Sequence, residues 1–326
     1  MKSTYFTIID NKLNGFSSYI KDPSEPRYHK AGAKQGGQVS KAQLGGVYDT
    51  FIDRKKYKVL FKQGRNDGET ISEFIASKFY ACILPGYGAS VFLAKKDRAT
   101  NTKALVTSDL HPEVYIGTVF YDEFEEIFKL MAFKDRPLFL QTRYAKKSHQ
   151  FIMQQHDTNL GEVLAVSLWL GDYDTHIANL GLANIAGQKQ YVKIDHGWSF
   201  AQIQDFMDYK SVPWHGLDGF GKPTNHFSDY DHDGFLKNPN GNFCKKIKQL
   251  KQIRKEYIKS ILEYCFTELD NYYTTAAYLS FAKWIGYPHL HVVGKEQLIS
   301  YLTEKLYTRA INGIKPTRGG KSYFYT

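Results

Sequence analysis

The sequence is poor in cysteine and has no long apolar run. Its 326 residues include only Cys82, Cys244 and Cys265, which are too few and too scattered for a disulfide framework or a zinc site. This pattern is typical of a reducing compartment. No stretch approaches the roughly 20 apolar residues that a membrane-spanning helix needs, and the N-terminus lacks the apolar core of a secretory signal. We therefore expect no transmembrane segment and no export by the classical route.

Acidic residues are too few to balance the basic ones. The chain has 43 lysines and arginines against 33 acidic residues, for a formal net charge of +10. This excess favours polyanionic partners, among them anionic lipids, nucleotides and soluble polyphosphates. Nucleic acid is less supported, because no recognised reader motif accompanies the charge.

Repeats, low-complexity tracts and Pro/Gly-rich linkers are also lacking, so no composition boundary divides the chain. The patterns predict an α+β fold with a small sheet-containing lobe followed by a mostly helical lobe. We expect an irregular N-terminal extension over residues 1–44, the sheet-containing lobe over 45–115, and the helical lobe, with a basic C-terminal part, over 116–326.

The smaller lobe is predicted from short β-prone runs around one helix. Strands are expected at Tyr48–Ile52 and Tyr57–Phe61, as a hairpin, and again at Ala89–Ala94 and Ala104–Thr107. The helix starts near Asp67 or Thr70 and stops before Pro85. Its apolar residues recur at helical spacing: Ile71, Phe74, Ile75, Phe79 and Cys82.

The larger lobe is predicted to be helical around one hairpin. A helix begins near Asp157–Asn159 and ends at Leu170, and a hairpin pairs Ala183–Ile185 with Tyr191–Ile194. The remaining expected helices are Tyr121–Phe133, Phe243–Leu269, Tyr272–Ile285 and Lys295–Ile311.

Two short segments carry the strongest chemical signal. Asp174 precedes Asn179 by five residues on a loop after a helix, and Asp195 opens an Asp-X-Gly element after a strand. Asp174 is the candidate base, and Asn179 and Asp195 are candidate ligands for Mg²⁺ or Mn²⁺, a hard cation that prefers oxygen. Asp172 lies in the same loop but lacks the five-residue offset to Asn179. Asp and Asn are also common in turns, so the combination of both segments carries the prediction.

A lysine and a glutamate could complete a phosphate site. Lys62 ends a strand, and the next helix offers Glu69 and Glu73 as partners, of which we favour Glu73 because it lies beside the apolar face. Glu73 could instead close a capping box with Thr70.

Two other features could contact phosphates or larger anions. The pair Gly45-Gly46 precedes the first hairpin and could offer backbone amides to a phosphate, although it lacks the G-x-G-x-x-G spacing and could be an ordinary turn. A basic helix could hold a phosphorylated inositol or an anionic headgroup, or simply present a solvated face. Its basic residues are Lys245, Lys246, Lys248, Lys251, Arg254 and Lys255.

These motifs resemble those of an atypical branch of the protein-kinase-like superfamily. Asp174–Asn179 resembles the D-R-H-x-x-N loop of phosphoinositide kinases and HipA-type kinases, with Thr175 in place of arginine. Asp195-His196-Gly197 looks like the D-F-G element with histidine in place of phenylalanine. Over about residues 45–200 the chain is similar to atypical effector kinases of intracellular bacterial pathogens, including the inositol-phosphate-dependent effector kinase of Legionella. The resemblance implies a two-lobed kinase fold, ATP, a divalent metal and delivery into a host cell.

The sequence therefore predicts an ATP- and magnesium-dependent kinase that acts on Ser/Thr hydroxyls of a host protein. Inositol hexakisphosphate or a phosphoinositide membrane is expected to bind its basic surface, and secretion is expected by a non-classical route. Two alternatives remain open. The shared D-x-H-x-x-N order also fits a phosphoinositide kinase, and the substitutions at Thr175 and His196 also fit a catalytically inactive, anion-binding pseudokinase.

Overall fold

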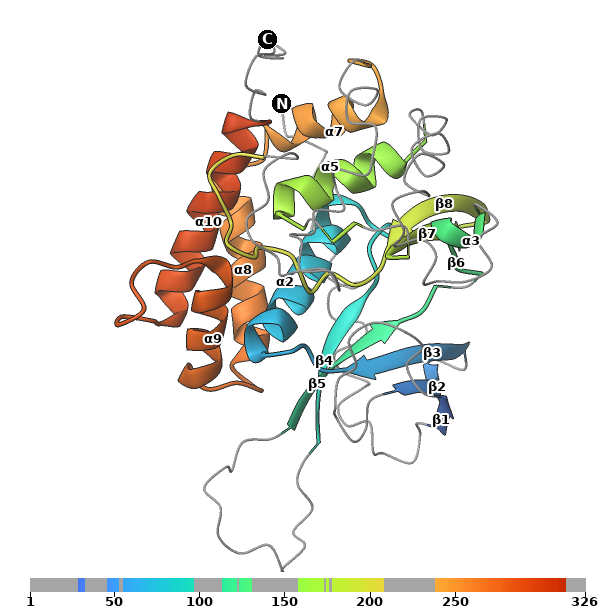
Figure 1. Cartoon of the computed structure of the whole chain (residues 1–326), viewed down its shortest axis with the longest axis horizontal. Coiled ribbons are helices and arrows are strands. Elements are labelled where there is room, and N and C mark those ends of the chain that lie inside the picture. The colour runs from blue at the N-terminus through green and yellow to red at the C-terminus, as the bar shows by residue number, and fades with distance from the viewer. Residues whose placement is uncertain are drawn as a thin grey trace, which may run out of the picture.

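The computed structural model describes residues 29–32, 46–52, 55–96, 113–121, 123–130, 158–172, 174–175, 178–207 and 238–314. In this part of the chain a five-stranded sheet lies on one side, a helical assembly lies on the other, and a smaller sheet flanks them (Figure 1). The predicted α+β fold with a sheet-containing part and a mostly helical part is confirmed.

The larger sheet is antiparallel and has the strand order β1-β2-β3-β5-β4. Its strands are β1 (His29–Gly32), β2 (Gly46–Ile52), β3 (Lys55–Lys62), β4 (Val91–Lys96) and β5 (Glu113–Val119). Alternation along β3 explains its placement, because Val59 and Phe61 are buried while Lys58 is exposed. The central strands place Lys62 opposite Ile116.

The predicted hairpin and the strand at β4 are confirmed, with shifted ends. The irregular character predicted for residues 1–44 is wrong for β1, which pairs with β2 as an edge strand. A four-residue edge strand has too short a pattern to read. The strand expected at Ala104–Thr107 lies outside the described residues, and the predicted boundary at 115/116 falls inside β5.

Helix α2 (Asp67–Ile83) is the centre of the molecule (Figure 1). The side chain of Asn66 caps its first turn by accepting from the amide of Glu69, and the predicted apolar residues are all buried. Its polar face is buried as well. Ser77 bonds the backbone of β4 at Val91, and Lys78 donates to the carbonyl oxygen of Val91 at 2.9 Å. The helix is therefore enclosed on all sides.

The helical assembly surrounds α2 and includes α5, which leads into the Asp174 loop. Its elements are α5 (Leu160–Leu170), α7 (Asn242–Leu250), α8 (Lys255–Leu269), α9 (Thr275–Ile285) and α10 (Lys295–Asn312). The small sheet pairs β6 (Glu125–Glu126), β7 (Leu180–Ile185) and β8 (Gln188–Lys193) in that order. The short helix α3 (Ile127–Leu130) packs against β6 and β7. Within the described residues, no helix combines the length and apolar character needed to cross a bilayer.

Three helix predictions need correction. Within the predicted helix at Tyr121–Phe133, the described residues form β6 and the one-turn α3. The single helix predicted over Phe243–Leu269 is two helices, α7 and α8, with a break at residues 251–254. Helix α9 starts at Thr275, three residues later than predicted. The predictions for α5, α10 and the β7–β8 hairpin are confirmed.

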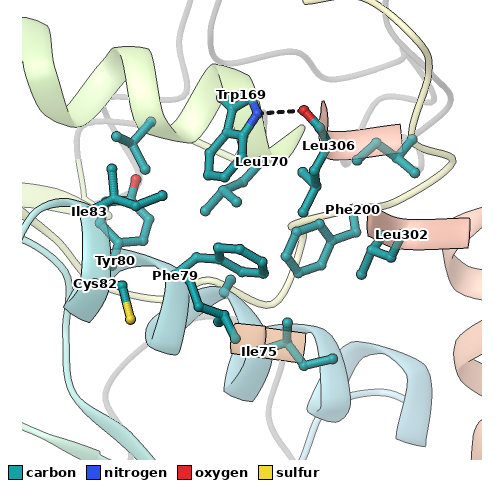
Figure 2. Close-up of a cluster of buried hydrophobic side chains, with 14 of the residues drawn as sticks. Ile75, Phe79, Tyr80, Cys82, Ile83, Trp169, Leu170, Phe200, Leu302 and Leu306 are labelled. Atoms are coloured by element: carbon teal, nitrogen blue, oxygen red, sulfur yellow. Dashed lines mark hydrogen bonds between the residues drawn. The ribbon is translucent and has the colours of Figure 1, made fainter. Parts of the chain in front are cut away.

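The core lies where α2, α5 and α10 meet (Figure 2). Phe79 makes edge contacts with Trp169 and Phe200, at ring-centroid distances of 5.5 and 6.2 Å. The indole nitrogen of Trp169 donates to the carbonyl oxygen of Leu306 at 2.9 Å, so this buried aromatic keeps its polar atom bonded. The packing fixes the end of α5, from which the Asp174 loop departs.

A buried arginine secures the same helix end. The guanidinium of Arg309 on α10 donates to the carbonyl oxygens of Leu168 and Trp169, in the last turn of α5, at 2.6 and 2.8 Å. It also donates to the carbonyl oxygens of Gln204 and Phe206. A cation at a helix C-terminus satisfies orphan carbonyls and complements the helix dipole. Arg309 thus joins α5, α10 and the chain beyond Phe200.

We predict that Arg309→Met lowers the free energy of unfolding by at least about 3 kcal/mol, because it removes hydrogen bonds to four carbonyl groups, two of them buried. Urea denaturation of both proteins measures the difference. Arg254→Met is the matched control and should shift stability by no more than about 0.5 kcal/mol, since Arg254 is exposed. Equal effects of the two substitutions would contradict the role given to Arg309.

Candidate active site

A buried lysine joins three parts of the chain. The ammonium of Lys62, at the end of β3, lies 2.9 Å from a carboxylate oxygen of Glu73 on α2. It also lies 2.9 Å from a carboxylate oxygen of Asp195, which follows β8. Lys62 and Glu73 are almost fully buried, whereas the Asp195 side chain is 35% exposed. The structure therefore brings together three of the predicted site residues, and Asp195 is the most exposed of them.

Burial and charge shift the ionisation of this cluster. Burial alone would lower the pKa of the Lys62 ammonium, but Asp195 and Glu73 outweigh it and raise that pKa above its ordinary value. Burial raises the pKa of Glu73 to about 7, against the opposing effect of Lys62. The lysine thus stays charged.

The structure decides between the two roles that the sequence left open for Glu73, a helix-capping residue or the partner of Lys62. The helix cap is formed by Asn66, and Glu69 reaches back from three residues later to accept from the backbone amide of Arg65 at 2.6 Å. Glu69 therefore fills the position of a capping-box glutamate. Glu73 is left to pair with Lys62, as predicted.

The candidate base follows shortly after α5 in the chain. The side-chain nitrogen of Asn179 donates to the backbone oxygen of Asp174 at 3.0 Å and to its carboxylate at 3.2 Å. The backbone amide of Asp174 donates to a carboxylate oxygen of Asp172 at 3.2 Å. The five-residue offset thus brings both predicted side chains together, and leaves the amide oxygen of Asn179 as the atom suited to a cation.

The β7–β8 hairpin sets the two loops beside each other. Leu180 pairs with Lys193 in the antiparallel register, and the backbone amide of Ile194 donates to the oxygen of Asn179 at 2.8 Å. Because Asn179 and Asp195 flank these contacts directly, the end of the Asp174 loop and the Asp-X-Gly element are neighbours in space.

The Asp-X-Gly element has an unusual backbone and tight packing. Asp195 has φ of +58°, a conformation that non-glycine residues rarely adopt. His196 is fully buried and stacks on Tyr80 of α2 at a centroid distance of 4.6 Å, and burial holds its pKa well below the ordinary value. A Cβ at Gly197 would lie 3.1 Å from Glu69 and 3.4 Å from Glu73, so glycine permits this close approach.

The oxygen atoms at this site fit a magnesium ion held jointly with a nucleotide. Among the described residues, no three His, Cys, Asp or Glu side chains are grouped to hold a metal by themselves. Mg²⁺ does not need such a group, since it is usually held by one or two protein oxygens together with phosphates and water. The Asp195 carboxylate and the Asn179 amide oxygen are oxygen donors of that kind.

The predicted glycine pair is only partly described. Gly45 lies outside the described residues, and Gly46 begins β2 with φ of +148°, where glycine is favoured. Its contact with a phosphate remains a prediction.

The six basic residues around α7 do not form one exposed face. Lys246 is buried and lies 3.8 Å from Glu162 on α5, and Lys255 is paired with Glu304 on α10. Lys245, Lys248 and Arg254 are exposed, and Lys251 is partly buried. Sequence reasoning treated the six as equivalent, because only the packing of α7 against α5 distinguishes them.

One pair of charged residues was missed. The ammonium of Lys193 lies 2.9 Å from a carboxylate oxygen of Asp172, and both side chains are fully buried. A weak signal was present in the sequence, since each residue precedes a predicted site aspartate by two positions. Their pairing requires the β7–β8 hairpin and could not be read from either segment alone.

We predict that Lys62→Met lowers the free energy of unfolding by about 2 kcal/mol or more, because it leaves Glu73 buried without its cation. Glu73→Gln should cost about 1 kcal/mol or less, since an amide keeps a hydrogen bond to Lys62 and Asp195 still pairs with the ammonium. Thermal and urea denaturation measure both values. Lys58→Met, on the same strand but exposed, is the control and should be near neutral. The reverse order of Lys62→Met and Glu73→Gln would contradict the assigned network.

Comparison with known proteins gives one family match and several similar folds. The family model for the LepB N-terminal domain matches residues 117–316. Among solved structures, the N-terminal 618-residue fragment of LepB from Legionella pneumophila is similar, with a TM-score of 0.50 and 13% identity. The match covers 81% of this chain and 46% of that fragment, so the chain spans about half the length of its relative.

Two kinase structures are more distant. The Helicobacter pylori proinflammatory kinase CtkA matches with a TM-score of 0.44 and 14% identity, over 90% of this chain and 98% of that one. The kinase domain of Mycobacterium tuberculosis PknI matches with a TM-score of 0.29 and 11% identity, over 56% of this chain and 65% of that one. No curated protein sequence matches.

The elements of the candidate site follow one another along the chain in the predicted order. They are a strand lysine, a helix glutamate, the Asp174 loop, a hairpin and the Asp-X-Gly element. The family model matches residues 117–316, which is more than half of the 326-residue chain. The chain belongs to the LepB N-terminal domain family.

Proposed function

We propose that this protein is a kinase that transfers the γ-phosphoryl group of ATP, with a divalent metal ion, to Ser or Thr hydroxyls of a host protein. The observation that carries the proposal is the Lys62 ammonium, held 2.9 Å from both Glu73 and Asp195. A cation fixed in this way is suited to hold a nucleotide's phosphates.

The residues divide the work of phosphoryl transfer among them. Asp174 orients the acceptor hydroxyl and takes its proton, while the Asn179 amide holds that carboxylate in place. Lys62, fixed by Glu73, holds the phosphate chain. Asn179 and Asp195 would hold Mg²⁺ or Mn²⁺, which neutralises charge on phosphate oxygens. Catalysis of this kind depends mainly on positioning and electrostatics.

Family membership supports a role outside the producing cell. The matching LepB fragment comes from Legionella pneumophila. By this relationship we propose that the chain acts as a bacterial effector, secreted by a non-classical route into the host cytoplasm and peripheral on host membranes. A phosphoinositide is the second candidate acceptor, because the Asp174-x-His176-x-x-Asn179 order is the one shared with phosphoinositide kinases.

The basic surface supports a regulatory polyanion. Lys245 and Lys248 are exposed three residues apart on α7, and Arg254 is exposed just before α8. Inositol hexakisphosphate or a phosphoinositide headgroup binding there would contact basic side chains on α7 and at the residue that precedes α8.

We predict that the wild-type protein, given γ-labelled ATP and magnesium, labels protein substrates, and that Asp174→Asn lowers kcat by about 10²–10⁴-fold. Glu263→Gln, an exposed change on α8, is the matched control and should leave kcat unchanged. The assay offers the protein a host-cell lysate and phosphoinositide vesicles side by side. Label in lipid alone would favour the second candidate. No label with any acceptor or metal would leave an inactive pseudokinase that only binds anions.

We also predict that inositol hexakisphosphate accelerates transfer and that Lys245→Glu with Lys248→Glu raises its half-saturating concentration about tenfold or more. A double reversal at two other exposed lysines, Lys189→Glu with Lys283→Glu, keeps the net charge equal and should have a much smaller effect. Equal responses of the two double variants would show that net charge, not this surface, is sensed.

A further inference from the structure

A buried ion pair lies directly beneath the two loops of the candidate site. Asp172 on the Asp174 loop and Lys193 at the end of β8 have completely buried side chains, and their charged atoms are 2.9 Å apart. Burying two charges is unfavourable unless each is paired and hydrogen-bonded. Packing alone therefore does not explain why this ion pair is buried.

Each partner also bonds the backbone of a residue that carries chemistry. Asp172 accepts from the backbone amide of Asp174 at 3.2 Å. Lys193 donates to the backbone oxygen of Asp195 at 2.6 Å. The pair thus forms a continuous bridge from the backbone of the candidate base to the backbone of the candidate metal ligand.

The bridge has a further anchor on the Lys62–Glu73 side. The Ser199 hydroxyl donates to Asp172 at 3.2 Å, and the Ser199 backbone oxygen accepts from the hydroxyl of Ser72. Ser72 precedes Glu73 on α2. The same bridge therefore also ties the two loops to the helix that carries the glutamate.

The geometry at Asp195 explains why a strong donor is needed there. Asp195 has φ of +58°, and a non-glycine residue persists in this strained region only when its surroundings hold it there. The charge-assisted bond from Lys193 acts on the carbonyl of that residue. An apolar side chain of similar size in place of Lys193 would fill the space but could not donate to this carbonyl.

We infer that Asp172 and Lys193 are positioning residues, and that their buried bridge sets the backbones of Asp174 and Asp195 relative to each other. Its consequence for catalysis rests on the proposed kinase function; the structural bridge itself does not.

The test compares Asp172→Asn, Lys193→Met and the double variant. Each single change leaves one buried charge unpaired and should lower the unfolding temperature, whereas the double change removes both charges and should recover most of that loss. The kcat of the double variant should nevertheless stay at least about tenfold below wild type, with KM for ATP within about threefold, since Lys62 and Glu73 are untouched. Recovery of kcat together with stability would show that the pair only neutralises charge.

Hydrogen exchange provides a readout that does not depend on activity. The amides of residues 172, 174, 175 and 194–199 should exchange about tenfold faster or more in Asp172→Asn and in the double variant, while amides of α8 and α10 keep the wild-type rate. Lys259→Met, which breaks the exposed Lys259–Glu263 pair, is the control and should change neither region. Wild-type exchange in both loops of Asp172→Asn would overturn the inference, even if the protein proved to have no kinase activity.

Discussion

The whole site depends on one buried cation that several chain segments must share. Lys62 brings its charge from the sheet, Glu73 from the central helix, and Asp195 from the segment after β8. If the sheet and the central helix moved apart, Lys62 and Glu73 would separate and a buried charge would lose its partner. Such a loss is far more costly than losing an exposed ion pair. The requirement explains why α2 must lie against both the sheet and the helical assembly.

Polar contacts, rather than apolar packing, fix how α2 sits. Hydrophobic burial is not directional, and α2 has buried residues on all of its faces, so apolar burial alone does not specify which face meets the sheet. Ser77 and Lys78 bond the start of β4, and Tyr80 bonds Ser167 on α5 at 2.6 Å. Such bonds have defined directions and lengths. They set the helix in the one register that places Glu73 opposite Lys62.

Much of this structure could be predicted from local sequence patterns. The parts that depend on long-range contacts could not. The β2–β3 hairpin, α5 and the Asp174–Asn179 loop could be predicted because each is specified by neighbouring residues. By contrast, β1 gains its stability from pairing with β2. The burial of Lys246 depends on Glu162, more than eighty residues away in the chain. The Asp172–Lys193 bridge likewise exists only after the hairpin has folded. A single sequence shows the partners but not their pairing.

The substitution of histidine in the Asp-X-Gly element is consistent with this fixed arrangement. Because burial lowers its pKa, His196 is neutral, and its ring stacks on Tyr80 as another aromatic would. Tyr80 in turn is bonded to α5 through Ser167. The segment that carries Asp195 is therefore held at two points. The ring of His196 packs against Tyr80 of α2, and Lys193 donates to the backbone oxygen of Asp195. An electrostatic site works best when its charges are already in place before the substrate arrives. These two restraints, one on the His196 ring and one on the Asp195 backbone, hold the segment in place in this way.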